Sequence, residues 1–170
     1  MESIKPIETV YNGYRFRSRL EARWAVFMDI LGIEYRYEPE GFDLGNGLWY
    51  LPDFYLPRTN AWVEVKGFKP SKTDIEKMIR FGDAKCDFVN GGAKFRLLLG
   101  DIPNCLADNG FCHGVPCYNF LSVDECYTHK IIATKGILSE GLWIPTTDKG
   151  KVKIALYGAK KARFEHGECG

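Results

Sequence analysis

The sequence predicts a mixed α/β fold, because two amphipathic helical segments alternate with short apolar runs of strand character. Helical spacing of apolar residues is clear over residues 18–31 and again over about 72–85. Three extended runs separate these helices, and a fourth, residues 95–99, follows the second helix. Since a helix that bridges two strands brings them together in parallel, we expect a mixed sheet flanked by helices.

The bulk composition indicates a single domain with a proper core. The chain has 170 residues, of which 45% are hydrophobic, and its formal net charge is +1. Overall basicity therefore gives no sign of nucleic-acid binding, and local clusters have to be considered. We expect residues 1–100 to form the core and residues 101–170 to be an extension packed on it.

Short apolar runs and the lack of a secretion signal predict a cytoplasmic protein with no membrane partner.

The first helix has clear start and stop signals. A hairpin is expected over residues 9–17, around the turn Asn12-Gly13. Ser18 then fits the N-cap, Glu21 completes a capping-box pattern three residues later, and Gly32 ends the helix. The apolar face recurs at three- and four-residue spacing, through Leu20, Trp24, Phe27, Met28 and Leu31.

Extended runs and further helices follow in order. The runs are expected over residues 33–37, 41–54 (with a turn near 45–47) and 61–65. The second helix follows Pro70-Ser71, and a last helix is expected from about 151 to 164. The last helix is expected to pack through Ile154, Leu156, Tyr157 and Phe164.

The strongest functional signal is a set of charged residues within the apolar runs. Asp53 ends the middle run, and Glu64 and Lys66 flank one valine in the next. Because side chains alternate along a strand, Glu64 and Lys66 share one face. Two carboxylates and a lysine can thus converge on one side of a pair of strands.

This combination suits the hydrolysis of a phosphodiester. The reaction needs a positioned water, help in deprotonating it, and positive charge on the developing phosphorane. Mg²⁺ prefers carboxylate and water oxygens, so Asp53 and Glu64 are candidate ligands for Mg²⁺ or Mn²⁺, and the Val65 carbonyl could supply another oxygen. Lys66 either holds a phosphate oxygen or orients the attacking water, and the sequence leaves both roles open.

The spacing resembles the PD-(D/E)XK nuclease superfamily, which has the restriction-endonuclease-like fold. Pro52-Asp53, ten intervening residues and Glu64-Val65-Lys66 form the pattern. The segments 37–42 and 50–54 are similar to small phage nucleases and transposon-end-cleaving endonucleases of this superfamily. The resemblance covers about residues 10–100 and implies a core of helix, three strands, helix and strand. It also implies metal-dependent cleavage of DNA, with Glu21 as a further catalytic and metal-binding acid.

Simpler interpretations stand beside these assignments. Glu64 and Lys66 could form only a same-face ion pair, and Glu21 could serve only its helix cap.

Four arginines crowd into the nine residues from 15 to 23, where they are expected to contact the nucleic-acid backbone: Arg15, Arg17, Arg19 and Arg23.

The leading hypothesis is a Mg²⁺-dependent endonuclease in which Glu21, Asp53, Glu64 and Lys66 are catalytic. One alternative is a Holliday-junction or branched-DNA resolvase of the same fold, which would act as a homodimer. Another is a non-catalytic nucleic-acid-binding protein that kept the nuclease fold.

The six cysteines are expected to be reduced, since no export signal is present. A zinc site in the cysteine-rich loop is the less favoured interpretation, because the gaps of six and four residues lack paired knuckles. Its candidate ligands are Cys105, Cys112, His113 and Cys117.

Overall fold

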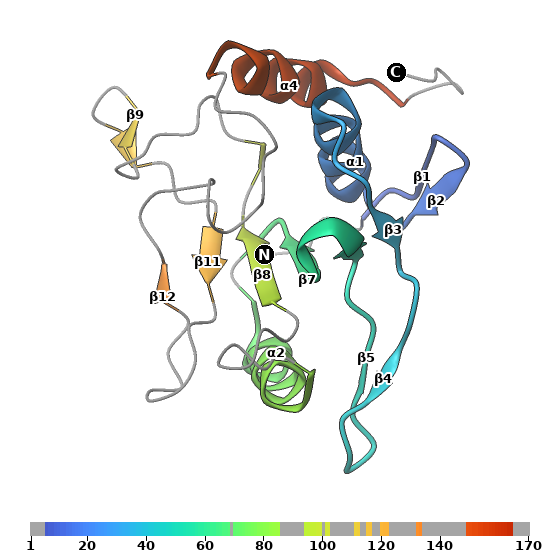
Figure 1. Ribbon diagram of the computed structural model, residues 1–170. Helices are drawn as coiled ribbons and strands as arrows, with labels where there is room; N and C mark the ends of the chain where they lie inside the picture. The colour runs from blue at the N-terminus through green and yellow to red at the C-terminus, as the bar shows by residue number, and fades with distance from the viewer. Residues whose placement is uncertain are drawn as a thin grey trace.

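A six-stranded mixed sheet forms the centre of the computed structural model (Figure 1). The structure describes residues 6–68, 70–85, 94–99, 101–102, 111–112, 115–116, 120–122, 132–133 and 149–164. The strand order is β12-β11-β8-β7-β6-β3, in which β7 and β8 are parallel and the other neighbours antiparallel. The strands are β3 (Arg36–Tyr37), β6 (Phe54–Leu56), β7 (Ala61–Lys66), β8 (Lys94–Leu99), β11 (Phe120–Ser122) and β12 (Ile132–Ala133).

The N-terminal hairpin and first helix confirm the sequence signals. Strands β1 (Thr9–Tyr11) and β2 (Tyr14–Phe16) pair antiparallel around Asn12 and Gly13, both of which have positive φ. Helix α1 (Arg19–Leu31) begins after Ser18, whose hydroxyl accepts a hydrogen bond from the Glu21 N–H. The helix ends at Gly32, which adopts the left-handed conformation that favours glycine.

The middle extended run differs from the single turn-containing strand that the sequence predicts. It forms a separate ribbon, β4 (Phe42–Asp43) paired with β5 (Trp49–Tyr50), and then strand β6 of the main sheet. The turn lies where it is expected, with Gly45, Asn46 and Gly47 all at positive φ. The ribbon extends away from the sheet (Figure 1), and Tyr50 returns from it toward the sheet.

The second half of the core follows the predicted order. A short 3-10 helix, η1 (Pro57–Thr59), connects β6 to β7, and helix α2 (Lys72–Lys85) connects β7 to β8. This crossover accounts for the parallel pairing of β7 with β8. The order helix, three sheet strands, helix, strand is therefore present as α1, β3, β6, β7, α2 and β8.

The two faces of the sheet bury different helices. Alternation along β7 places Val63 and Val65 in one apolar cluster with α1 and α4 (Lys149–Lys161), and Trp62 in a second cluster with α2. Phe81 of α2 and Phe95 of β8 complete the second cluster, where their rings meet edge to face. Glu64 and Lys66 alternate with the two valines and so share the α2 face.

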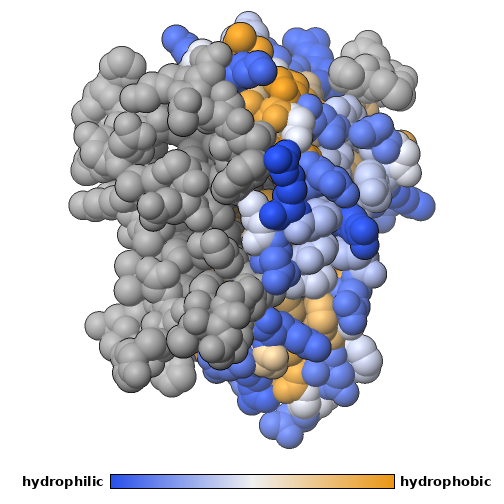
Figure 2. Space-filling view, viewed as in Figure 1, coloured by the Kyte–Doolittle hydropathy of each residue, from blue (hydrophilic) through white to orange (hydrophobic). Residues whose placement is uncertain are grey.

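Helix α4 packs on α1 through smaller residues than the sequence predicts. Ala155, Leu156 and Ala159 are buried, whereas Ile154 and Tyr157 are 65% and 66% exposed. A Cβ added at Gly158 would lie 2.5 Å from Cδ1 at the tip of the Ile30 side chain, so a larger residue there would force that side chain to move. Apolar surface gathers over α1 and α4 in Figure 2. Ile30 of α1 and Ile154 of α4 are 41% and 65% exposed.

The extension is described only in part. Strands β9 (Phe111–Cys112) and β10 (Val115–Pro116) form a two-stranded ribbon within the segment that was expected to be a loop. Cys105, His113 and Cys117, three of the candidate zinc ligands, lie outside the described residues, as does the side chain of Cys112. Across the residues that are described, no helix has the length and apolar character needed to cross a membrane.

Candidate active site

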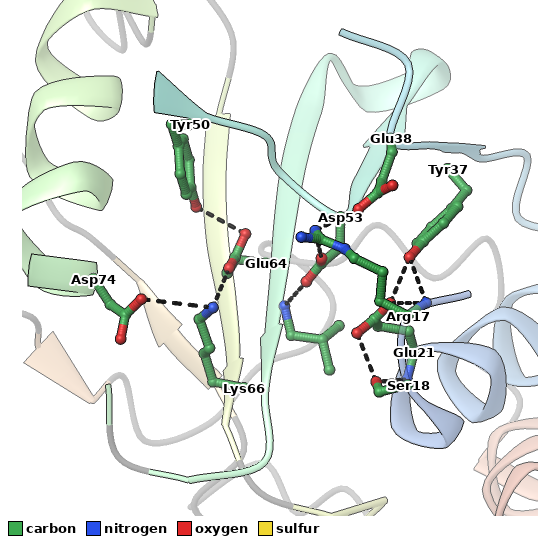
Figure 3. A network of polar contacts seen from close by, with 11 residues as sticks. Arg17, Ser18, Glu21, Tyr37, Glu38, Tyr50, Asp53, Glu64, Lys66 and Asp74 are labelled. Carbon is green, nitrogen blue, oxygen red and sulfur yellow. Dashed lines mark hydrogen bonds and ion pairs between the residues drawn. The ribbon is translucent and has the colours of Figure 1, made fainter. Parts of the chain in front are cut away.

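Strand β7 places Glu64 and Lys66 side by side, as the alternation predicts. The Lys66 Nζ lies 2.8 Å from the Glu64 Oε1, and both side chains face α2 (Figure 3). Glu64 is only 3% exposed, while the Lys66 side chain keeps 32% exposure. Burial acts to lower the pKa of Lys66, but the charge of Glu64 outweighs it and raises the pKa. The lysine therefore stays charged and within reach of solvent.

Asp53 lies opposite Glu64 on the neighbouring chain segment. Phe54 pairs with Val63, so continuing this antiparallel register by one residue sets Asp53 against Glu64. The Asp53 Oδ2 accepts a hydrogen bond of 2.7 Å from the Val65 N–H, and Asp53 is 3% exposed. Burial raises the pKa of Asp53 well above its ordinary value, and the charges of Glu64 and Glu21 raise it further.

Two like charges in directly opposed, buried positions are destabilising unless a cation lies near them. Burial also raises the pKa of Glu64, although the charge of Lys66 and hydrogen bonds from Lys66 and Tyr50 oppose this effect. The Tyr50 hydroxyl donates to the Glu64 Oε2 at 2.9 Å from the end of β5. Glu64 is thus oriented on both of its oxygens by neighbours from different elements.

Arg17 supplies the cation on the other side of the site. It lies between β2 and α1, and its Nη2 is 3.1 Å from the Asp53 Oδ1 and also pairs with Glu38. Burial acts to lower the pKa of Arg17, but the charges of Asp53 and Glu38 raise it. Its side chain is 55% exposed, against 4% for that of Asp53. Of the four expected DNA-contacting arginines, Arg17 is the one placed among the site carboxylates.

The other three arginines take up separate positions. Arg15 is ion-paired with Glu8 on the exposed N-terminal hairpin, with its Nε 2.9 Å from the Glu8 carboxylate. Arg19 is half-buried at the start of α1. The Nη1 of Arg23 lies 3.6 Å from the Oδ1 of Asp101. The sequence cluster therefore divides in the structure, and contact of these arginines with nucleic acid remains a prediction.

Glu21 is at the edge of the site rather than at its centre. Its carboxylate accepts hydrogen bonds from the Ser18 hydroxyl (2.6 Å), the Tyr37 hydroxyl (2.6 Å) and the Arg17 N–H (3.1 Å). Glu21 approaches from α1, whereas Glu64 projects from the α2 face of the sheet (Figure 3). Among the described residues, no three Asp, Glu, His or Cys side chains are grouped closely enough to hold a metal ion as they stand.

Two further acids belong to the site. Glu38 directly follows strand β3 and has φ of 43°, so its backbone departs from the strand and its carboxylate reaches Arg17. Asp74 lies in the first turn of α2, with its Oδ1 3.8 Å from the Lys66 Nζ, and it accepts a hydrogen bond from the Ser71 N–H. The pattern Ser71-x-x-Asp74 is a capping signal that could have identified Asp74. Nothing local in the sequence indicates the positive φ of Glu38.

The donor set matches the chemistry of a hard divalent cation. Asp53 and Glu64 offer carboxylate oxygens from neighbouring segments of the chain, and burial raises the pKa of both. The Val65 N–H donates to Asp53, and whether the Val65 carbonyl takes part in a metal site stays a prediction. By residue type, these two carboxylates fit a hard divalent cation of the magnesium type, with water and substrate as the further ligands it would need.

Comparisons with protein-family models, with curated proteins and with solved structures gave no match to this chain. The geometry of the site therefore carries the argument about function.

Proposed function

We propose that this protein is a metal-dependent endonuclease of the PD-(D/E)XK type that hydrolyses phosphodiester bonds in DNA. One observation carries the proposal: two buried carboxylates, Asp53 and Glu64, oppose one another across adjacent segments beside a charged, partly exposed lysine. Burial raises the pKa of both acids, so ionising them in the folded protein costs stability. Such a cost is typical of a functional site.

Each residue has a distinct task in the proposed reaction. Asp53 and Glu64 would hold Mg²⁺ or Mn²⁺, which when bound supplies positive charge for the scissile phosphate and lowers the pKa of a bound water. Lys66 can donate from its ammonium group to a phosphate oxygen or to the attacking water. Tyr50 keeps Glu64 in position through its hydroxyl. Glu21 orders the Arg17 backbone, and direct metal binding by Glu21 would require its carboxylate to leave Ser18 and Tyr37.

The arrangement of elements supports the family assignment as well as the chemistry. A helix, three sheet strands, a helix and a strand parallel to the third occur in the order that the resemblance implies. Asp53 lies immediately before the second of these strands, and Glu64 and Lys66 lie on the third. This order, with the acids and the lysine on neighbouring segments, agrees with what the resemblance implies and supports the proposal.

The proposal is tested by a cleavage assay with a matched pair of variants. Wild type, Glu64→Gln and Glu34→Gln are incubated with supercoiled, linear, single-stranded and branched DNA, each with Mg²⁺, Mn²⁺ or EDTA. Glu34 is exposed and lies outside the site, so its variant controls for the loss of one negative charge. We expect metal-dependent products from wild type and Glu34→Gln, and about 1,000-fold slower cleavage by Glu64→Gln.

Equal cleavage by Glu64→Gln and wild type would contradict the proposed mechanism. The absence of a metal-dependent product from every substrate, with a folded wild type, would instead favour the non-catalytic nucleic-acid-binding alternative. Selective cleavage of the branched substrate would favour the resolvase alternative, and the active species should then be a dimer.

A further inference from the structure

We infer that Arg17 is an exchangeable counter-ion of the active site: it neutralises Asp53 in the metal-free protein and moves to a substrate phosphate when a divalent cation takes Asp53. The inference rests on the proposed function, since it assigns a positioning and substrate-binding role to a residue of that same site. It starts from the two cations of the site, Arg17 and Lys66, and from how differently they are held.

The first step concerns the Asp53 carboxylate, whose two oxygens already have partners. The Val65 N–H occupies Oδ2 at 2.7 Å, and the Arg17 Nη2 occupies Oδ1 at 3.1 Å. The main-chain N–H belongs to the buried strand β7 and cannot leave without disrupting the sheet. Each oxygen keeps a second lone pair, but a divalent cation bound at Oδ1 would lie beside the Arg17 guanidinium and be repelled by its charge, so the two cations compete for Asp53.

The second step concerns the mobility of the arginine. Its side chain is 55% exposed and comes from the short connection between β2 and α1, residues 17 and 18. The backbone N–H of Arg17 donates to both the Glu21 carboxylate and the Tyr37 hydroxyl, so the main chain is anchored while the exposed guanidinium can move. Glu38, with a partly exposed carboxylate, shares the guanidinium with Asp53 and gives it a second resting partner.

The third step concerns the destination of the freed guanidinium. Once a divalent cation neutralises Asp53, the attraction between Asp53 and Arg17 weakens, because the cation and the guanidinium repel each other. A guanidinium binds phosphate oxygens in a bidentate manner and remains charged at all relevant pH values. A DNA backbone that reaches the metal brings a phosphate to within the length of this side chain, so Arg17 can exchange one anionic partner for another.

Lys66 is held differently from Arg17. It is two residues from Glu64 on the same strand, its Nζ is 2.8 Å from the Glu64 Oε1, and Asp74 lies on its other side. Lys66 thus has its main partner on its own strand, whereas Arg17 is paired with acids from other elements. Binding of metal and binding of DNA would then be coupled through Arg17.

The test measures divalent-metal affinity without DNA, by calorimetric titration of Mn²⁺ into wild type, Arg17→Gln, Arg17→Lys and Arg36→Gln. Removing the competing charge should tighten Mn²⁺ binding by Arg17→Gln about tenfold, which corresponds to about 1.4 kcal/mol. Arg17→Lys keeps the charge and should bind close to wild type. Arg36 is exposed on the neighbouring strand β3, so Arg36→Gln should leave the affinity unchanged.

A second readout follows DNA affinity with Ca²⁺ present, as a function of salt. Loss of one phosphate contact in Arg17→Gln should reduce the slope of log affinity against log salt by about one. A third measurement uses the wild type alone, so that a folding defect in a variant does not decide the question. In a crystal structure with Ca²⁺ bound at Asp53, the Arg17 Nη2 should have left the Asp53 Oδ1.

An Arg17→Gln affinity for Mn²⁺ equal to or weaker than that of wild type would overturn the inference, as would an intact Arg17–Asp53 contact in the Ca²⁺-bound structure. These outcomes are distinct from failure of the proposed function. If wild type cleaves DNA in a metal-dependent way but Arg17→Gln binds Mn²⁺ no more tightly, the exchange of Arg17 is contradicted and the nuclease function is supported. If Arg17→Gln binds Mn²⁺ more tightly but wild type cleaves no DNA, the competition between Arg17 and the metal is supported and the nuclease function is contradicted.

Discussion

On the β7 side of the site, the carboxylate and the cation that face each other are two residues apart on one strand. On the α1 side, Arg17 and Asp53 are 36 positions apart and meet only because the fold brings the start of α1 to the beginning of β6. Alternation along one strand brings the first pair together, whereas the second pair depends on tertiary contacts between separate elements. The difference favours our proposal that Lys66 stays beside Glu64 and that Arg17 can exchange partners.

The two helices that border the site begin in the same way. Ser18 and Glu21 cap α1, and Ser71 and Asp74 cap α2, with each serine hydroxyl accepting from the N–H of the acid three residues later. The two acids differ in what else they contact: Glu21 accepts from the Arg17 N–H and from Tyr37, whereas Asp74 lies near Lys66. One capping pattern thus places an acid on each side of the site.

The largest effect is expected on the β7 side, from Lys66→Met. Loss of the ammonium should slow cleavage by about 100- to 1,000-fold, because a positioned cation stabilises the developing charge. Metal affinity should not fall, since Lys66 is not a ligand and its removal leaves Glu64 more negative. Single-turnover rates at saturating Mg²⁺ test this, with Lys153→Met, on exposed α4, as the control. A rate close to that of wild type would show that the two sides do not differ as described.

Tyr50→Phe should have the next largest effect, since it removes one of the two groups that orient Glu64. Metal affinity should fall about tenfold, which is the lower end of what loss of a ligand-orienting partner costs. Tyr55→Phe is the matched control, because the Tyr55 hydroxyl bonds to exposed Asn60 at 3.1 Å. Calorimetry measures the metal affinity of both variants. Equal losses of metal affinity in Tyr50→Phe and Tyr55→Phe would contradict this expectation.

The metal-free protein should lose stability as the pH rises. Burial raises the pKa of Asp53, Glu64 and Glu38 in the folded state, so their protonated forms favour folding and this contribution disappears as they ionise. In EDTA, the free energy of unfolding should therefore fall as the pH rises above the ordinary carboxyl range of about 4 toward 8. Asp53→Asn should flatten this dependence and raise the melting temperature at pH 8 by about 2–4 °C.

Urea unfolding across this pH range provides the measurement. Saturating Mg²⁺ should reduce the loss of stability at high pH, because the cation binds the ionised carboxylates. A metal-free stability that rises steadily from pH 5 to pH 8 would show that folding does not raise the pKa of these carboxyls.

The smallest effect is expected from Asp74→Asn. The asparagine oxygen can still accept from the Ser71 N–H, and the 3.8 Å ion pair with partly exposed Lys66 contributes at most about 1 kcal/mol. Cleavage should change by less than about twofold, as measured beside Lys66→Met. A loss comparable to that of Lys66→Met would instead make Asp74 a necessary partner of the lysine.

Signals that operate over a few residues were sufficient to predict much of this fold. The Asn12-Gly13 turn, the Ser18 cap, the Gly32 stop and the second helix are confirmed, as is the shared face of Glu64 and Lys66. Each depends on local geometry that residue type alone dictates. The order of helices and strands follows from these elements and is also confirmed.

Features that depend on distant contacts were not predicted. The middle run divides into a ribbon and a sheet strand because Tyr50 and Phe42 pack against Phe81 of α2 rather than within the sheet. The prediction that Ile154 and Tyr157 pack was wrong, since the close approach of α4 to α1 selects Ala155 and Ala159 instead. Glu38 entered the site through a positive φ, and Glu21 was drawn toward Tyr37 and away from Glu64.

The central claim is that Asp53 and Glu64 together bind a divalent cation. Calorimetric titration of Mn²⁺ into wild type, Asp53→Asn, Glu64→Gln and the exposed-site control Glu34→Gln tests it most directly. The account predicts binding by wild type and Glu34→Gln, and affinities at least about tenfold weaker in the other two variants. Equal affinity of all four proteins for Mn²⁺ would contradict it.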